Sequence, residues 1–185
     1  MIYALIGRSG SGKSTLQNMI SEHLNIPKVI LTTTRPMRQG ERQDIDYHFI
    51  SQEEFELRLE QNRFVETTAY NSWYYGTDIQ NIPNNNNCIV VANPLGYYQM
   101  LNKLKENNVT GIVIHSDDKM RMLNALNREK HPDVRELCRR FLSDENTYSE
   151  IEHDHKVWHV ENIFNNIKFA ESQIELIIKM TKELH

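Results

Sequence analysis

The chain has few cysteines, few prolines and no long apolar run. Its two cysteines, Cys88 and Cys138, stand far apart without the spacing of a metal site, which argues against a disulfide scaffold and indicates a reduced protein. No apolar stretch approaches the length of a membrane span. The first residues also become glycine-rich too soon for a signal peptide. We therefore expect a cytoplasmic protein that binds no membrane.

Positive charge is also scarce, because 21 Lys and Arg residues stand against 25 Asp and Glu residues and leave a net charge of −4. This balance argues against broad nucleic-acid binding, which usually requires a basic surface. A small anionic ligand stays possible, since a few local arginines suffice to bind one. With 185 residues, of which 39% are hydrophobic and 25% charged, the chain has the composition of one globular domain. We expect a monomer or a homodimer.

Short apolar runs alternate with amphipathic segments along most of the chain. The apolar runs predict buried strands at 2–6, 29–31, 88–92 and 111–115. The amphipathic segments predict helices at 14–24, 96–106, 118–129, 134–152 and 167–183. Such alternation is typical of a parallel sheet covered on both faces, so we expect an α/β fold.

Residues 34–80 break this alternation. Tyr47–Ile50 predicts a short strand, and the capping box that begins at Ser51 predicts a helix to about residue 62. The segment 64–75 has the pattern of extended chain. We expect these residues to form a small α+β lobe inserted into the main domain.

One motif, Gly7–Ser14, fits the phosphate-binding pattern G-x-x-x-x-G-K-[ST] completely. It follows a predicted strand and precedes a predicted helix, which is the context in which such a loop binds phosphate. Backbone N–H groups of the loop and the positive end of the helix would face the phosphate chain. Lys13 can reach the outer phosphates, and the Ser14 hydroxyl can bind Mg²⁺. The motif predicts a bound nucleoside triphosphate, with contacts from Gly7, Arg8, Ser9, Gly10, Ser11, Gly12, Lys13, Ser14 and Thr15.

A second set of side chains indicates a second anion site. Arg35 and Arg38 lie three residues apart around a proline and can aim two guanidinium groups at one phosphate. Tyr47 and Tyr75 carry phenolic donors that could complete such a cage. Glu66 only accepts hydrogen bonds when ionised, which suits a ring edge with two adjacent donors, as guanine has.

In these segments the chain resembles the guanylate kinase family. The strings GRSGSGKST, TTRPMRQGE, DYHF, FVE and YYGT occur in the family's order and spacing, and the resemblance covers about residues 1–170. It implies a P-loop nucleoside monophosphate kinase with the three-layer α/β core of P-loop NTPases, an inserted α+β lobe that binds the nucleoside monophosphate, and a helical lid. The core would comprise about 1–33, 81–120 and 141–185, the lobe about 34–80 and the lid about 121–140.

The resemblance also implies a reaction, the phosphorylation of GMP or dGMP by ATP with Mg²⁺ as cofactor. It places GMP against Arg35, Arg38, Tyr47, Glu66, Tyr75, Thr77 and Asn93. Charge on the transferred phosphoryl group would be stabilised by Lys13, Arg38, Arg128 and Arg140. Asn162 would lie beside the adenine of ATP.

Three departures from the family pattern concern the acceptor and the lid. Leu31 stands where the family commonly has a serine, Val91 and Asn93 stand where it has aspartates, and Asn-Arg-Glu at 127–129 replaces Gly-Arg-Gly. The lost polar contacts would be worth about 1 kcal/mol each, so guanine selectivity could be weaker or shifted. Asn93 could still donate to a base oxygen or a sugar hydroxyl. Mg²⁺ would rest on Ser14, phosphate oxygens and water.

Two alternatives stay open from the sequence. The same scaffold could serve a kinase of another (deoxy)nucleoside monophosphate or of a ribose phosphate, as Leu31 and Asn93 suggest. A non-catalytic guanylate-kinase-like binding module is disfavoured by the intact phosphate loop. Among the lid arginines, Arg139 competes with Arg140 for the transferred phosphoryl group, and Arg121 and Arg135 are expected on solvated helix faces.

Overall fold

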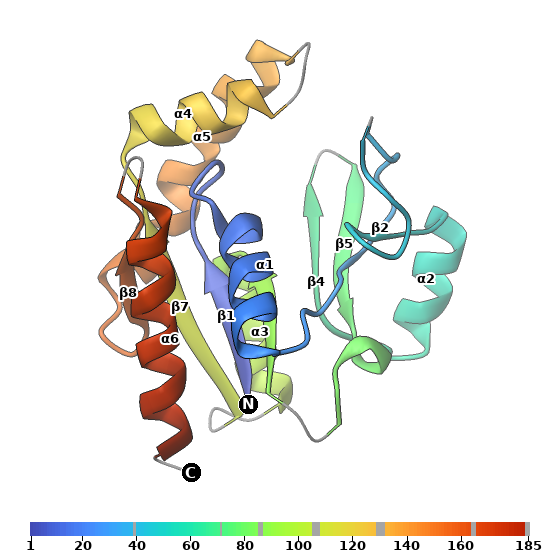
Figure 1. Cartoon of the computed structure of the whole chain (residues 1–185). Helices are drawn as coiled ribbons and strands as arrows, with labels where there is room; N and C mark the ends of the chain where they lie inside the picture. Colours follow the sequence, from blue (N-terminus) through green and yellow to red (C-terminus); the bar gives the residue numbers. More distant parts are fainter. Residues whose placement is uncertain are drawn as a thin grey trace.

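The protein folds into a core sheet, a smaller sheet beside it and a pair of helices across one end (Figure 1). This computed structural model describes residues 1–38, 40–70, 72–84, 87–104, 108–128, 132–163 and 166–183. Among these residues, no helix is both long and apolar enough to cross a membrane.

The core sheet has the strand order β6-β1-β7-β8, and every neighbouring pair is parallel. Its strands are β1 (Ile2–Ile6), β6 (Cys88–Ala92), β7 (Val109–His115) and β8 (Trp158–Glu161). All of β1 is apolar and buried, as expected for a strand covered on both faces.

Three helices cover the two faces of this sheet: α1 (Lys13–Leu24), α3 (Pro94–Leu104) and α6 (Ile167–Glu183). Side chains of β1 alternate between the faces, so Tyr3 and Leu5 join one apolar cluster while Ala4 and Ile6 join the other. The first cluster includes residues of α1 and α6, and the second includes residues of α3. The result is the predicted three-layer α/β core.

The smaller sheet forms the lobe and has the strand order β3-β2-β5-β4. Its strands are β2 (Thr32–Thr33), β3 (His48–Phe49), β4 (Phe64–Tyr70) and β5 (Trp73–Asp78), followed by a short 3₁₀ turn at Ile79–Asn81. Helix α2 (Gln52–Glu60) starts at the predicted cap, where Ser51 Oγ accepts from the Glu54 N–H at 3.2 Å. Phe55 anchors α2 to the sheet by stacking on Phe64, with ring centroids 4.3 Å apart.

The pair of helices across the end of the core consists of α4 (Asp118–Asn127) and α5 (Val134–Tyr148). Each begins at an aspartate cap: Asp117 accepts from the N–H groups of Lys119 and Met120, and Asp133 accepts from that of Glu136. In Figure 1 the two helices extend over the phosphate loop toward the lobe. A 3₁₀ turn at Ile151–His153 then leads the chain back to β8.

One predicted strand of the core sheet is wrong. The apolar run at 29–31 makes no ladder with β6, because only Lys28 forms a bridge, to Ile89, before the chain leaves the sheet. Directly after the run, Thr32–Thr33 enters the lobe sheet instead. The run is apolar because Val29 is buried in the connection between the two sheets. Burial alone does not distinguish a buried connecting segment from a buried strand.

The other predicted elements differ from the observed ones only near their ends. The helix predicted over 134–152 ends at Tyr148, and the residues that follow it form the separate 3₁₀ turn. The predicted helix ends at 105–106 and at 129 lie outside the described residues. Strand β8 was not predicted as a strand, since Trp158, His159 and Glu161 are exposed and leave only Val160 as an apolar core residue.

The core packing predicts how much stability is lost when a cavity is made in the core beneath α1. Leu16 on α1 is fully buried against the sheet, so Leu16→Ala should lower the free energy of unfolding by roughly 2–5 kcal/mol. Leu142→Ala is the matched control, because Leu142 is 73% exposed and its loss should cost less than about 0.5 kcal/mol. Urea unfolding measures both, and equal losses would contradict this assignment of the core.

Candidate functional site

The phosphate loop joins β1 to α1 at the carboxyl end of the core sheet. Gly12 precedes α1 with a φ of 90°, in the left-handed region that favours glycine, and a Cβ there would lie 2.6 Å from Asn162 Nδ2. Gly12 is also the capping residue, and as a glycine it has no side chain to bond the N–H groups of the first turn of α1. The helix therefore presents its positive N-terminal end to the loop, as an anion-binding turn requires.

Lys13 lies across the loop rather than along the helix. Its Nζ donates to the carbonyls of Gly7 and Arg8, at 2.6 and 2.9 Å. Burial lowers the pKa of this ammonium to about 8, an effect that the Asp144 carboxylate opposes and that Arg121 and Arg128 reinforce. A phosphate bound beside Lys13 would offset this desolvation and favour the charged form.

An ion pair between the two end helices holds the loop from outside. Asp144 Oδ2 accepts from the Ser9 N–H at 2.7 Å and from Arg121 Nη2 at 3.1 Å. Arg121 Nε in turn donates to the Ser9 carbonyl at 3.1 Å. The pair thus contacts both the N–H and the carbonyl of one loop residue.

The prediction of a solvated Arg121 is wrong, because its side chain is only 1% exposed. It packs on the Phe141 ring, 4.4 Å from the centroid, and reaches the loop through the contacts above. No pattern in the sequence indicates this burial, since the partner Asp144 lies on another helix. Arg135 is exposed, as predicted.

Two predicted ATP-binding residues use their side chains to support the loop. Arg8 makes paired bonds with Glu152, both of 2.7 Å, and a further ion pair with Glu145. Asn162 is buried, and its Nδ2 donates to the Ser11 carbonyl at 2.8 Å. Their side chains hold the loop in place, and the contact of Asn162 with adenine stays a prediction.

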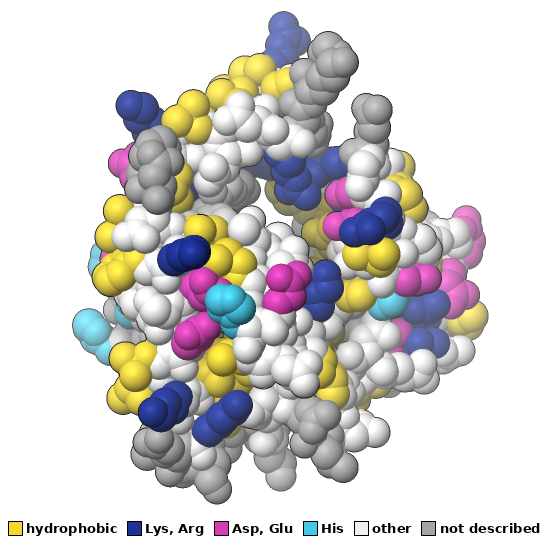
Figure 2. All heavy atoms as spheres, viewed as in Figure 1, with side chains coloured by type: hydrophobic (Ala, Val, Ile, Leu, Met, Phe, Trp, Pro, Cys, Tyr) yellow, Lys and Arg dark blue, Asp and Glu magenta, His cyan; other side chains and the backbone are white. Residues whose placement is uncertain are grey.

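A cleft of about 290 Å³ opens between the phosphate loop, the lobe and the end helices. An adjoining cavity of about 360 Å³ shares Arg38 and Arg128 with it and adds Ser14. Figure 2 shows lysine and arginine side chains beneath the end helices, facing the hollow between core and lobe. The cleft collects most of the predicted side chains: Lys13, Arg35, Arg38, Tyr47, Glu66, Tyr75, Asn93, Arg128 and Arg140.

Arg35 and its neighbours form one corner of this cleft. Arg35 is 4% exposed, lies over the Tyr47 ring at 5.3 Å and donates to Glu41 Oε1 at 2.8 Å. Glu41 Oε2 accepts from the Arg38 N–H at 2.8 Å. Burial raises the pKa of Glu41, but these two bonds together with the charges of Arg35 and Arg38 outweigh it and leave that pKa below its ordinary value. The sequence reasoning missed Glu41, whose position six residues after Arg35 was the available signal.

Glu66 forms a second corner of the cleft, on its buried side. It is 6% exposed, and its Oε1 accepts from Thr77 Oγ1 at 2.8 Å. Burial raises the pKa of its carboxyl to about 7, against the opposing effect of the Thr77 bonds. Thr77 is itself buried and reaches the site through Glu66.

Helix α3 closes the back of this corner. A Cβ on Gly96 would lie 2.8 Å from Glu66 Oε2, so glycine permits the close approach. Asn93 Oδ1 accepts from the Gly96 N–H at 2.8 Å and caps α3. Because its oxygen is engaged, Asn93 offers a ligand the donor NH₂ group. Leu31 and Val91 line the same cleft as apolar groups.

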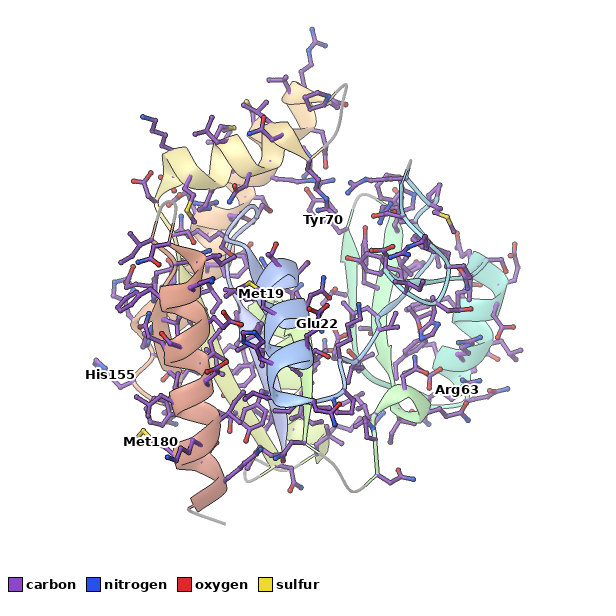
Figure 3. All side chains as sticks on the ribbon, viewed as in Figure 1. Met19, Glu22, Arg63, Tyr70, His155 and Met180 are labelled. Carbon is purple, nitrogen blue, oxygen red and sulfur yellow. The ribbon has the colours of Figure 1, made fainter. Side chains whose placement is uncertain are left out.

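Among the described residues, the end helices contact the lobe through Arg128 and through Tyr70. Arg128 Nη2 lies 3.8 Å from Glu41 Oε1, and Tyr70 at the tip of the β4–β5 hairpin bonds Glu136 and Arg139 of α5. Figure 3 shows Tyr70 projecting toward these helices. Arg140 also contacts Tyr70, with its guanidinium 5.4 Å from the ring centroid. The arginines over the cleft are therefore linked to the position of the lobe.

Comparison with known proteins gives concordant matches. The model of the guanylate kinase family matches residues 1–175. The guanylate kinase of Fusobacterium nucleatum is 31% identical over 169 residues, which span 89% of this chain and 88% of that protein. The guanylate kinase of Chlorobaculum tepidum is 44% identical over 70 residues, 37% of this chain and 36% of the relative. The crystal structure of guanylate kinase from Anaplasma phagocytophilum superposes with a TM-score of 0.71 at 21% identity, covering 97% of this chain and 85% of that one.

The Arg121–Asp144 pair predicts unequal costs for two aspartates that contact one arginine. Asp144→Asn removes the buried counter-charge of a buried guanidinium and leaves it only the exposed Asp118, so the free energy of unfolding should fall by about 3 kcal/mol. Asp118→Asn removes the other partner, which is 74% exposed, and should cost less than about 1 kcal/mol. Urea unfolding of both variants measures the difference. Similar costs would show that the buried pair does not hold the helices to the loop.

Proposed function

This chain belongs to the guanylate kinase family and is a nucleoside monophosphate kinase, and we propose that the cleft transfers the γ-phosphoryl group of ATP to GMP or dGMP. The family match and the names of the relatives support ATP as donor and GMP as acceptor. They give no support to the other acceptors that the sequence left open.

The observation that carries the proposal is the presence of two anion sites facing one cleft. The phosphate loop with Lys13 stands on the core side, and Arg35, Tyr47 and Tyr75 stand on the lobe side. A triphosphate on the loop would point its end toward a monophosphate held by the lobe. Hydrolysis or switching would need only the first site, so the second favours transfer between two nucleotides.

The chemistry requires positioning and charge stabilisation more than covalent participation by the protein. Lys13, Arg38, Arg128 and Arg140 all line the cleft and would stabilise the charge that spreads over the transferred group. A phosphate acceptor is already anionic, so no general base is needed. The contacts of the end helices with Tyr70 and Glu41 support a role for them as a lid that would exclude water from the transfer.

Mg²⁺ fits the residues at the edge of the phosphate loop. The Ser14 side chain is exposed and lines the cavity that adjoins the cleft, while the apolar Val91 takes the strand-end position. Mg²⁺ keeps several waters and needs few protein ligands, so Ser14 with phosphate oxygens and water would suffice. The ion would neutralise part of the charge on the outer phosphates.

Glu66 and Asn93 are the groups that would bind the base. The ionised Glu66 can accept from the N1–H and the 2-amino group of guanine, and the Asn93 NH₂ can donate to a base oxygen or a sugar hydroxyl. Thr77 holds the Glu66 carboxylate in place. Leu31 and Val91 add apolar contact rather than further polar selection.

We divide the chain into a core at about 1–33, 81–120 and 141–185, a GMP-binding lobe at about 34–80 and a lid at about 121–140. The lobe sheet supports this division, although β2 already belongs to it and α5 extends to Tyr148. With both cysteines free, we propose a cytoplasmic enzyme that acts on small nucleotides as a monomer or a homodimer, without nucleic acid or membrane.

A coupled assay of ADP formation from ATP and GMP tests the function. Lys13→Ala should lower kcat/KM by about 100-fold or more, because it removes the cation beside the triphosphate. The matched control is Lys179→Ala, since Lys179 lies exposed on α6 and should leave turnover unchanged. Absence of turnover with both GMP and dGMP in the unmodified protein would refute the proposal, and full activity of Lys13→Ala would refute the mechanism.

The raised pKa of Glu66, to about 7, predicts that GMP affinity depends on pH. Below this pKa the carboxyl is protonated and turns one of its oxygens into a donor, which matches guanine poorly. The KM for GMP should therefore fall as pH rises from about 6 to about 8. Glu66→Gln should raise the KM and flatten this dependence, whereas the ionisation of the GMP phosphate itself affects both proteins alike. Parallel profiles for the two proteins would exclude Glu66 as the base-binding group.

A further inference from the structure

We propose that His23, Glu171 and Glu175 form a binding site for a divalent transition-metal ion of the Zn²⁺ type. His23 lies in the last turn of α1, and the two glutamates lie one turn apart on α6. The site is at the far end of α1 from the phosphate loop, about 15 Å along the helix axis. It is independent of the cleft and of the proposed kinase function.

The three side chains already converge on one point. His23 Nδ1 lies 2.8 Å from Glu171 Oε1 and 3.4 Å from Glu175 Oε1. One ligand atom from each residue lies within 4.8 Å of the others. Figure 2 shows histidine and acidic side chains gathered over the face formed by α1 and α6. Three ligand atoms at such distances can share one ion without rearrangement of the helices.

The state of Glu171 is the independent reason to infer a ligand. Its side chain is 6% exposed, yet Oε1 has no hydrogen-bond partner among the described residues. His23 Nδ1 is close to this oxygen but not aligned with it for a hydrogen bond. A buried carboxylate oxygen without a partner is costly. Two side chains that bind one ion both point at the ion and not at each other. A bound ion therefore accounts both for the short distance between His23 Nδ1 and Glu171 Oε1 and for the lack of a hydrogen bond between them.

The donor set and its position select the kind of ion. One imidazole nitrogen and two carboxylate oxygens suit Zn²⁺, which accepts N and O ligands and can take water in a fourth position. Mg²⁺ prefers octahedral oxygen ligands and is a poorer match to the imidazole. Two carboxylates balance the charge of a divalent ion. The carbonyl end of α1, where His23 lies, also favours a cation.

A metal ion at this position would join α1 to α6. These two helices cover the same face of the core sheet, and α1 carries the phosphate loop at its other end. Because the ion would bind the folded core and not the unfolded chain, it should stabilise the fold by mass action. Turnover need not change, since none of the three residues lines the cleft.

The test uses the full chain, freed of metal by a chelator and then titrated with Zn²⁺ alone in the absence of nucleotide. Calorimetry should show one tight equivalent per chain, and thermal unfolding should shift to higher temperature with Zn²⁺ but not with the same concentration of Mg²⁺. His23→Gln and Glu171→Gln should each weaken Zn²⁺ binding at least about tenfold. His23 is mostly exposed, so His23→Gln should unfold at the wild-type temperature in the presence of chelator.

His159→Gln is the matched control. His159 is exposed and lies 2.8 Å from His115, which makes that pair the competing site for Zn²⁺. The variant should keep the tight equivalent and the thermal shift. The proposal fails if His159→Gln loses them, if His23→Gln keeps them, or if the unmodified protein binds no stoichiometric Zn²⁺. Co²⁺ in place of Zn²⁺ gives a visible absorption spectrum that reports ligation by imidazole. This spectrum should be lost in His23→Gln and kept in His159→Gln.

Discussion

The phosphate loop has to present N–H groups to a phosphate chain, and much of the core is arranged to meet this requirement. A loop that turns its N–H groups inward turns carbonyls outward, and those carbonyls need donors elsewhere. The donors come from α1, α4 and the segment after β8: Lys13 for Gly7 and Arg8, Arg121 for Ser9, Asn124 for Gly10 and Asn162 for Ser11. The shape of the loop thus depends on elements that are distant in the chain.

Charge balance follows the same logic on both sides of the cleft. Lys13 lies near Arg121 and Arg128, and Asp144 provides the compensating negative charge. On the lobe side Glu41 does the same for Arg35 and also accepts from the Arg38 backbone. Each proposed anion site therefore contains one carboxylate that holds its cations in place. Both carboxylates are tied to the end helices, Asp144 by its position on α5 and Glu41 through Arg128.

The sequence predicted those parts of the fold that depend on local pattern. The strands at 2–6 and 88–92, the helix at 167–183 and the cap at Ser51 are observed where expected. Predictions failed where tertiary contacts decide, as for the apolar run at 29–31, where Val29 bonds Ile89 but no continuous ladder with β6 forms. The prediction of a solvated Arg121 was wrong for a related reason. In the pattern of an amphipathic helix, a buried arginine looks the same as a solvated one until its partner on α5 is known.

The candidate site shows the same division between motif and context. The motif residues Lys13, Arg35, Arg38 and Glu66 converge on the cleft, since each motif fixes both a residue type and its place on a loop or strand. Asp144 was not identified, because a lone carboxylate on a distant helix carries no spacing signal, and Glu41 was missed although it lies six residues after Arg35. Asn162 and Arg8 were assigned to the nucleotide; their side chains support the loop, and their nucleotide contacts stay a prediction. A motif names the residues near a ligand without dividing them into those that touch it and those that support it.

Guanine selectivity depends on which polar groups remain after the departures at Leu31, Val91 and Asn93. Two lost neutral contacts would cost about 1 kcal/mol each, whereas hydrogen bonds to a charged group contribute about 1.5–3 kcal/mol. Glu66 offers two such acceptors to guanine. Adenine presents an acceptor at N1, which would leave the buried carboxylate partly unpaired, and a site with that mismatch discriminates strongly. With GMP placed as proposed, the buried position of Glu66 would preserve the preference for guanine, and the departures would act on the sugar and on the apolar lining of the cleft.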